Sequence, residues 1–298
     1  MNDLVGSLRT RYRDVRTSRE LRAFLADPLN IAGLAIVGTL VIAAVFGPLV
    51  APYDPAAQDV PNRLQGPSLA HPFGTDQLGR DIFSRLLYGA RLSLGIAVLV
   101  TAIRLVLGTT IGVLAGYAGG WIDELLMRLV DVQLAFPGLV LALVIAGILG
   151  PSLRNVMIAL AVVGWASYAR VVRASVLSTK EREFVQAAQL MGVSRFRITI
   201  RHLLPNVASP VIVLATLNLG TVILGTAGLS FIGLGAQPPT PEWGTMLSAG
   251  RHYLRDAWWI ANIPGVAIML TVLGFNLLGD GLRDILDPKH DATSEKIT

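Results

Sequence analysis

Long apolar segments without a charged side chain constrain this sequence more than any other feature. The clearest is the run from Pro28 to Tyr53, which holds no charged residue. A helix needs about 20 mostly apolar residues to cross the hydrocarbon core of a bilayer. The run therefore predicts a membrane-spanning helix, which we place at 31–50. It is longer than the apolar core of a cleaved signal peptide, so we expect it to be retained.

The rest of the chain repeats this pattern. Only 15% of the 298 residues are charged, against about 25% in a soluble domain, and the mean hydropathy is +0.58. We predict an all-α integral membrane protein with about six transmembrane helices, at 31–50, 92–117, 131–154, 156–172, 207–234 and 258–278. Pro137 in the third of these spans either kinks the helix or is tolerated because neighbouring groups satisfy the freed carbonyl.

Lysine and arginine indicate the orientation of these spans. They gather in the N-terminal segment, in the segment 170–201 and after residue 280, and they are fewer in the segments on the other side. Positive residues favour the cytoplasmic side, so both termini are expected there and 54–85 forms an external loop. The net charge of +5 is then a topology signal, and no nucleic-acid partner is expected. The predicted units are 1–30, 31–90, 91–280 and 281–298: a cytoplasmic segment, the first helix with its external loop, a core transmembrane domain and a cytoplasmic tail.

Several kinds of chemistry are excluded by the residues that are missing. The chain has no cysteine and four scattered histidines, so disulfides and thiolate metal sites are ruled out and no metal site is expected. A phosphate-binding Walker A loop needs Gly-Lys followed by Ser or Thr, and none of the three lysines follows a glycine. We expect no cofactor on this chain and no enzymatic activity of its own.

The segment 178–206 is the most informative polar stretch. Ser178 and Glu181 have the spacing of a capping box, which predicts a helix over 179–191. Gly192 then permits a sharp reversal. Ser194 is expected to cap a second helix that ends near residue 201, and Pro205 to break the chain before the next span.

This pattern supports two interpretations of the segment. Phe184, Ala188 and Met191 would share one face of the first helix, so the segment could enter a cleft on a partner protein. Any short amphipathic basic segment could equally lie on anionic lipid headgroups.

The same segment resembles the "EAA" loop of bacterial ABC-importer permeases. Gln186-Ala187-Ala188, Gly192 and Leu204-Pro205 stand at the spacing of that motif, although Gln186 replaces the common Glu. Three further blocks, 71–94, 229–247 and 276–288, resemble the dipeptide/oligopeptide/nickel branch of the family. The residues before position 60 resemble the N-terminal module of its second permease subunit.

The resemblance implies a type I importer permease bundle in the bacterial inner membrane. It implies a second permease subunit, in a heterodimer, two ATPase subunits that bind ATP, and an external solute-binding protein. The loop would dock on the ATPase through Glu183, Phe184, Gln186, Ala187, Ala188, Gly192, Leu204 and Pro205. Dipeptides or oligopeptides are the expected solutes, with nickel, glutathione or another small solute as alternatives. A stand-alone secondary transporter or channel is a more distant alternative.

Two other places hold polar residues that a membrane protein must account for. Arg104 lies in the middle of the second predicted span, where a charge is costly; it either faces the translocation path or pairs inside the bundle, and Asp131 is one conceivable partner. The block from Gly74 to Asp81 alternates acids and glycines. It is either a calcium loop or, as we favour, a structural loop that contacts a partner. The segment 238–243 is expected to fold over the external mouth.

Overall fold

The computed structural model describes residue 22 and residues 24–286, which are mostly helical and contain no β-strand. The predicted all-α class is confirmed. Most of the predicted cytoplasmic segment 1–30 and the last part of the predicted tail 281–298 lie outside the described residues, so these two units stay predictions.

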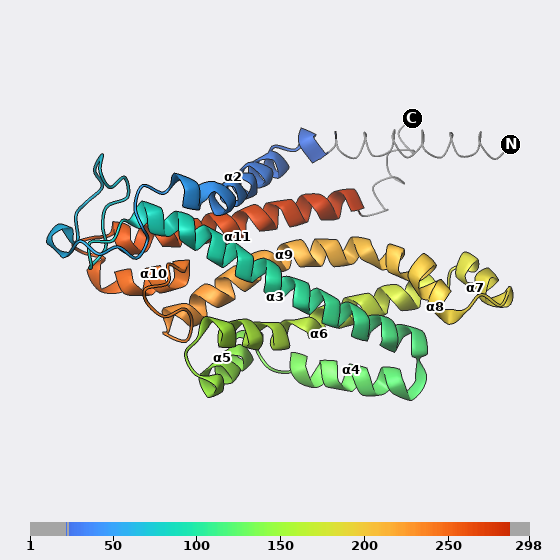
Figure 1. Ribbon diagram of the computed structural model, residues 1–298. Coiled ribbons are helices and arrows are strands. Elements are labelled where there is room, and N and C mark those ends of the chain that lie inside the picture. The colour runs from blue at the N-terminus through green and yellow to red at the C-terminus, as the bar shows by residue number, and fades with distance from the viewer. Residues whose placement is uncertain (1–21, 23, 287–298) are drawn as a thin grey trace.

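Five long helices run lengthwise beside one another (Figure 1). They are α2 (Pro28–Val50), α3 (Ile82–Ala118), α6 (Leu153–Lys180), α9 (Leu204–Phe231) and α11 (Trp259–Leu286). All five are long and apolar enough to span a membrane, and a bent pair of shorter helices raises the total to six in the described part of the chain. The segments 51–81 and 232–258 gather at one end of the bundle, the loop end, and 181–203 forms the opposite end, the elbow.

The predicted third span is wrong as a single helix over 131–154. The chain instead forms α4 (Gly120–Leu134) and α5 (Gly138–Leu149), bent by 86° at the break between them. Pro137 has no N–H to continue the helix and disfavours helical geometry in the residue before it. The proline therefore separates two helices instead of kinking one.

Helix α3 begins ten residues earlier than the predicted 92–117. The Asp81 carboxylate caps it by accepting a hydrogen bond from the Ser84 amide at 2.7 Å. Arg85 and Arg91 interrupt the apolar pattern in the first turns. For this reason the search for an uncharged span did not predict this part of the helix. At 1.5 Å per residue the 37-residue helix is about 55 Å long, so it extends past a hydrocarbon core of about 30 Å.

A row of glycines on α3 allows it to pack closely against α6. A Cβ atom on Gly112 would stand 2.6 Å from the Ala169 carbonyl oxygen, and one on Gly116 would stand 2.9 Å from Val176. Small residues allow two helix backbones to approach closely in a membrane. The larger apolar core lies along the first half of α3, up to Val100, where α6, α9 and α11 also contribute.

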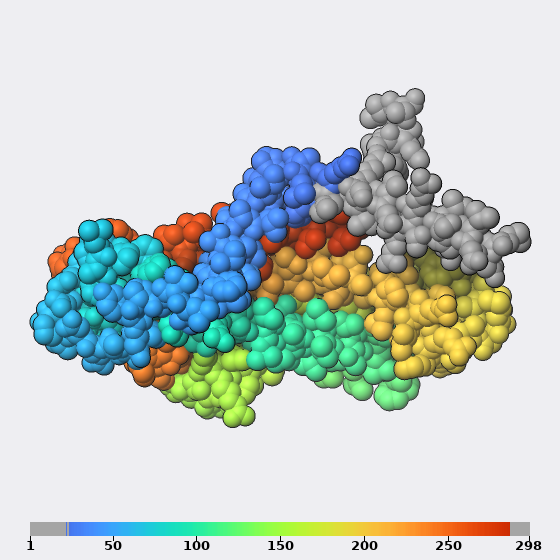
Figure 2. Space-filling view, turned by 45° about the horizontal axis from the view of Figure 1, so that its top comes forward, coloured from blue at the N-terminus to red at the C-terminus, as the bar shows by residue number. Residues whose placement is uncertain are grey.

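The loop end is folded around buried tryptophans. Its short helices are η1 (Val60–Asn62), α10 (Trp243–Gly250) and η3 (Arg251–Tyr253), and Figure 2 shows 51–81 packed as a compact knob on this end. Trp258 and Trp259 stand at the start of the last span, a position where tryptophans favour the membrane interface. Trp258 is half exposed, but Trp259 is buried and donates from Nε1 to the Thr75 carbonyl at 3.1 Å, so it holds the loop instead.

Candidate functional site

The elbow comprises α7 (Glu183–Leu190), α8 (Arg195–Ile198) and a short π-helical turn, η2 (Thr199–Leu203). It projects from the ends of α6 and α9, away from the loop end (Figures 1 and 2). The two-helix pattern predicted for 178–206 is present, with changed boundaries at both ends.

The predicted capping box at Ser178 is wrong. Ser178 and Thr179 still belong to α6, where the Thr179 hydroxyl donates to the Ser175 carbonyl at 2.7 Å, and Glu181 is the C-cap of that helix. Helix α7 starts only after Arg182, without a side-chain cap. Helix α6 extends past the predicted 156–172, to Lys180. The reason is that its apolar face continues through Val176 into the elbow.

Gly192 makes the predicted reversal. Its φ angle is +75°, a conformation that side-chain-bearing residues rarely adopt. The amide of Gly192 donates to the Gln189 carbonyl at 3.0 Å, and the amide of Val193 donates to the Ala188 carbonyl at 3.1 Å. These two bonds form a Schellman motif, which ends α7 and sends the chain into α8.

One side of the elbow is anchored on the bundle. Val185, Ala188, Ile198 and Leu203 are buried in a single cluster; the cluster also contains Tyr168, Val172 and Val176 of α6 and Val207 and Val211 of α9. The elbow and these two long helices therefore share a small core.

The elbow also leaves several large apolar side chains uncovered. Leu190 is 89% exposed, and Met191 and Phe196 are each 76% exposed. Phe184, Ile200 and Leu204 are partly exposed beside them, and Gln186, Ala187 and Pro205 are exposed too. Large apolar side chains gathered on a polar, Arg-rich segment mark an interaction surface.

The predicted common face of α7 is wrong. Ala188 is buried, whereas Phe184 and Met191 face outward, and Phe184 lies 5.8 Å from the His202 ring between ring centroids. The buried face is Val185 with Ala188, three residues apart. Leu190, Phe196 and Ile200 were not predicted as exposed residues of this segment. The available signal was that they are bulky and apolar in an otherwise charged loop.

The break predicted at Pro205 is also wrong. Residues 195–231 form one continuous helical span, with Pro205 in the first turn of α9. A proline ring inside a helix clashes with the carbonyl four residues before it. The π-turn at 199–203 directly precedes Pro205, and its wider spacing leaves room for the ring.

Arg104 is buried between α3 and α6. It is 5% exposed, and its Nε and Nη2 both donate to the Leu160 carbonyl oxygen, at 2.8 and 2.6 Å. A Cβ atom on Gly164 would overlap its guanidinium, so this glycine makes room for it. The arginine pairs with α6 inside the bundle and does not reach the surface of the chain.

Comparison with known proteins decides the family. The model of binding-protein-dependent transport system inner membrane components matches residues 108–291. The model of the N-terminal transmembrane domain of oligopeptide transport permease C matches residues 18–67. The chain belongs to the binding-protein-dependent permease family of ABC importers.

Individual relatives agree with this membership. The permease is 51% identical to the dipeptide transport system permease protein DppC of Alkalihalophilus pseudofirmus, over 88% of this chain and 86% of the relative. It is 47% identical to the di/tripeptide permease DppC of Pseudomonas aeruginosa, over 90% of both chains. It is also 47% identical to the glutathione permease GsiD of Escherichia coli O157:H7, over 90% and 89%.

A solved structure supports the same fold. The permease superposes on a chain of the MetNI methionine ABC transporter with a TM-score of 0.56 and 19% identity, over 68% of this chain and 96% of that one. The predicted family and importer fold are therefore confirmed. As a binding-protein-dependent permease, the chain is a multi-pass inner-membrane subunit that works with ATPase and solute-binding partners.

Two ion pairs of the permease join α4 to α6. Asp123 accepts from Nε and Nη2 of Arg173 at 2.5 and 2.6 Å, and Asp131 accepts from Arg170 at 2.5 Å. The conjectured pairing of Asp131 with Arg104 is thus wrong, because Asp131 lies on the outer side of α4 and pairs with Arg170. The spacing of the acids along the sequence could not show which helix would face them.

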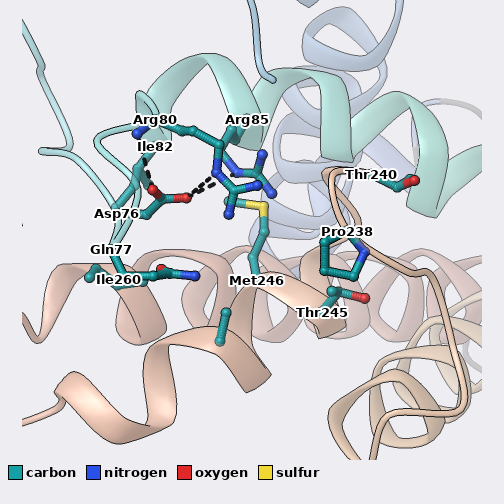
Figure 3. Close-up of a pocket in the computed structure, with 11 residues that line it drawn as sticks. Asp76, Gln77, Arg80, Ile82, Arg85, Pro238, Thr240, Thr245, Met246 and Ile260 are labelled. Carbon is teal, nitrogen blue, oxygen red and sulfur yellow. Dashed lines mark hydrogen bonds and ion pairs between the residues drawn. The ribbon is translucent and has the colours of Figure 1, made fainter. Parts of the chain in front are cut away.

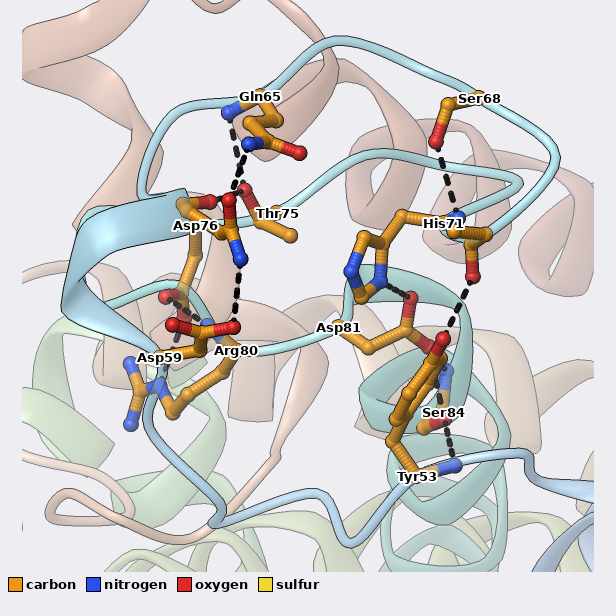
Figure 4. Close-up of polar contacts among 12 residues, drawn as sticks. Tyr53, Asp59, Gln65, Ser68, His71, Thr75, Asp76, Arg80, Asp81 and Ser84 are labelled. Carbon is orange, nitrogen blue, oxygen red and sulfur yellow. Dashed lines mark hydrogen bonds and ion pairs between the residues drawn. The ribbon is translucent and has the colours of Figure 1, made fainter.

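The Gly74–Asp81 block of the permease is a structural loop in this fold (Figure 4). Asp76 accepts from Arg80 Nε at 2.7 Å and from two backbone amides. Asp81 caps α3 and contacts His71 Nδ1 at 2.9 Å. Protein donors thus occupy these carboxylates, and no metal-ligand cluster lies in residues 24–286. This geometry disfavours the calcium-loop interpretation.

Proposed function

We propose that this permease subunit imports dipeptides or oligopeptides delivered by an external binding protein, with the elbow as its ATPase-docking surface. The observation that carries the docking role is the set of uncovered apolar side chains on an elbow that shares a core with α6 and α9. A segment of this kind can be bound by a partner protein, and its displacement can be transmitted to the two spanning helices with which it shares a core.

The docking surface is built from the exposed residues of the elbow. Phe184, Leu190, Met191 and Phe196 supply apolar area, and the small Ala187 allows a close approach. Glu183 lies exposed in the first turn of α7, where an acid is favourable. Gly192, Leu204 and Pro205 shape the turn and the start of α9, whereas Ala188 acts from the buried side.

The proposed assembly has four membrane-associated parts and an external protein. Two ATPase subunits bind ATP at the elbow end, which we place in the cytoplasm with both termini. A second, different permease subunit completes the pathway, and this chain itself binds no cofactor. The peptide assignment is supported by the names of its relatives, and the glutathione alternative by a relative of nearly the same identity.

The central test is Ala187→Trp in the assembled transporter. A bulky ring on the exposed face of α7 would hold the ATPase away from the elbow without entering the core. We expect copurification with the ATPase subunits to fall and ATP-driven uptake of a labelled dipeptide in proteoliposomes to drop at least tenfold. Competition by glutathione in the unmodified transporter distinguishes the two solutes.

The matched control is Ala70→Trp, on an exposed residue at the loop end. It should insert, copurify with the ATPase and hydrolyse ATP like the unmodified protein. If Ala187→Trp also keeps full copurification and uptake, the elbow is not the docking surface.

A further inference from the structure

A small hollow of about 40 Å³, which is open to solvent, lies at the loop end. It is bounded by the Asp76–Arg80 loop, the first turn of α3, the segment around Pro238 and helix α10 (Figure 3). None of the roles described above uses it. Its walls carry an unusual pair of charged groups.

Two buried guanidinium groups share one carboxylate in this hollow. Arg80, Arg85 and Asp76 are each 4% exposed. Arg80 Nε donates to Asp76 Oδ2 at 2.7 Å, and Arg85 Nε lies 3.7 Å from the same oxygen. Asp76 is the one carboxylate in ion-pair contact with either arginine among residues 24–286. The cluster therefore holds an excess positive charge.

The neighbouring acids are engaged elsewhere. Asp59 accepts from the side-chain amide of Asn62 at 2.7 Å, and Asp81 caps α3. Glu242 caps α10 by accepting from the backbone amides of Gly244 and Thr245, each at 2.9 Å. Arg85 turns one terminal nitrogen to the carbonyls of Pro55 and Pro239, at 2.7 and 3.3 Å. In the described part of the chain, the terminal nitrogens of Arg80 have no such hydrogen bond.

Gln77 adds a second unmet group to the same wall. Its side-chain oxygen is buried without a hydrogen-bond partner, and the side chain lines the hollow. The nitrogen and oxygen of a glutamine amide can exchange places by a flip, so Gln77 can present an N–H₂ donor here. A buried cation without its counter-charge is costly, and a carboxylate would satisfy both Arg80 and Gln77.

We propose that this hollow is a carboxylate-binding site, in which Arg80 makes a charge-assisted contact and Gln77 donates a further hydrogen bond. A guanidinium fork matches the geometry of a carboxylate. The carboxylate has two possible sources under the proposed function: the free C-terminus of a peptide solute, or an acidic side chain of the solute-binding protein. The binding site itself does not depend on that function.

The test is thermal unfolding of the purified full chain in nanodiscs with sodium acetate, at ionic strength matched with sodium chloride. We expect acetate to raise the melting temperature by about 2 °C over chloride, and neutral acetamide to have no effect. Arg80→Gln should abolish the rise. Arg63→Gln, which removes an exposed arginine of the same loop, should retain it.

Gln77→Glu keeps the test decisive if Arg80→Gln fails to fold. The new carboxylate would stand in the hollow and supply the missing counter-charge from within the chain. We expect a higher melting temperature without acetate and loss of the acetate-dependent rise. A rise that persists in Gln77→Glu, or an unmodified chain that responds equally to acetate and chloride, overturns the proposal.

A final comparison distinguishes the two sources of the carboxylate. If the site takes the end of a peptide, glycylglycine should act at a concentration at least tenfold lower than acetate, and its C-terminal amide should be inactive. If the site takes a protein side chain, glycylglycine and acetate should act at similar concentrations. Neither result depends on the ATPase subunits, so a failure here is separate from a failure of the elbow to dock.

Discussion

At the scale of single residues, the permease accommodates polar groups in its bundle by giving each a specific partner. Arg104 illustrates this, because two of its nitrogens converge on the Leu160 carbonyl. Gln133 of α4 also bonds α6, because its single Nε2 donates to the Val162 and Val163 carbonyls at 2.5 and 2.7 Å. These side chains bind α6 to its neighbours at one level of the bundle.

Gly164→Ala tests whether the space beside Arg104 is required. The new Cβ would overlap the guanidinium, and we expect it to lower the free energy of unfolding by about 1–3 kcal/mol, as overpacking commonly does. Thermal unfolding in detergent measures the effect. The control is Gly147→Ala in α5, where a Cβ meets nothing within 4 Å; it should be neutral or stabilising. Equal melting temperatures for the two variants would show that Arg104 is free to move.

At the scale of elements, α4 and α5 behave as a side arm that the ion pairs fasten to α6. The break before α5 leaves α4 with few apolar contacts, since Val130 is its one buried residue. The Asp123–Arg173 and Asp131–Arg170 pairs therefore contribute a large share of its attachment. They differ in exposure, because the side chains of the first pair are 16% and 33% exposed and those of the second 59% and 56%.

A double-mutant cycle should separate the two pairs. Using Asp123→Asn with Arg173→Gln, we expect a coupling energy of about 1 kcal/mol, because the contact is bidentate and partly buried. Using Asp131→Asn with Arg170→Gln, we expect about 0.5 kcal/mol or less, as for exposed pairs. Denaturant unfolding in detergent gives both values. A larger coupling for the exposed pair would contradict this account of how α4 is held.

At the scale of the whole molecule, the two ends of the bundle carry different kinds of surface. The loop end is closed by buried tryptophans and charged groups, whereas the elbow presents apolar side chains on a basic segment. A transporter that receives solute on one side and force on the other requires this asymmetry. The positive residues around the elbow support the proposed orientation, with the elbow on the cytoplasmic side.

Cysteine labelling tests that orientation directly, because the natural chain contains no cysteine. Ser194→Cys in the elbow and Ser68→Cys at the loop end each introduce one exposed thiol. In intact spheroplasts, a membrane-impermeant maleimide should label Ser68→Cys and should reach Ser194→Cys only after the membrane is opened. The opposite labelling pattern would invert the topology and remove the elbow from the ATPase side.

Much of this architecture could be predicted from local sequence. The uncharged run before Tyr53 predicts α2 because a bilayer requires long apolar helices, and Gly192 predicts the turn because few other residues adopt its conformation. The elbow motif and three further blocks resemble the permease family, and the comparisons confirm that resemblance. Each of these predictions depends on properties of consecutive residues.

The tertiary structure alone decided which distant residues meet. The sequence of α3 contains Arg104 but cannot show that Gly164 leaves room for it, and the acids of α4 do not reveal their arginines. Trp259 holds the Thr75 loop instead of lying in the lipid interface, and the Gly192 turn brings Val185 and Ala188, rather than Phe184, against α6. Local pattern specifies where helices form, whereas the direction in which each side chain points depends on close packing between segments far apart in the chain.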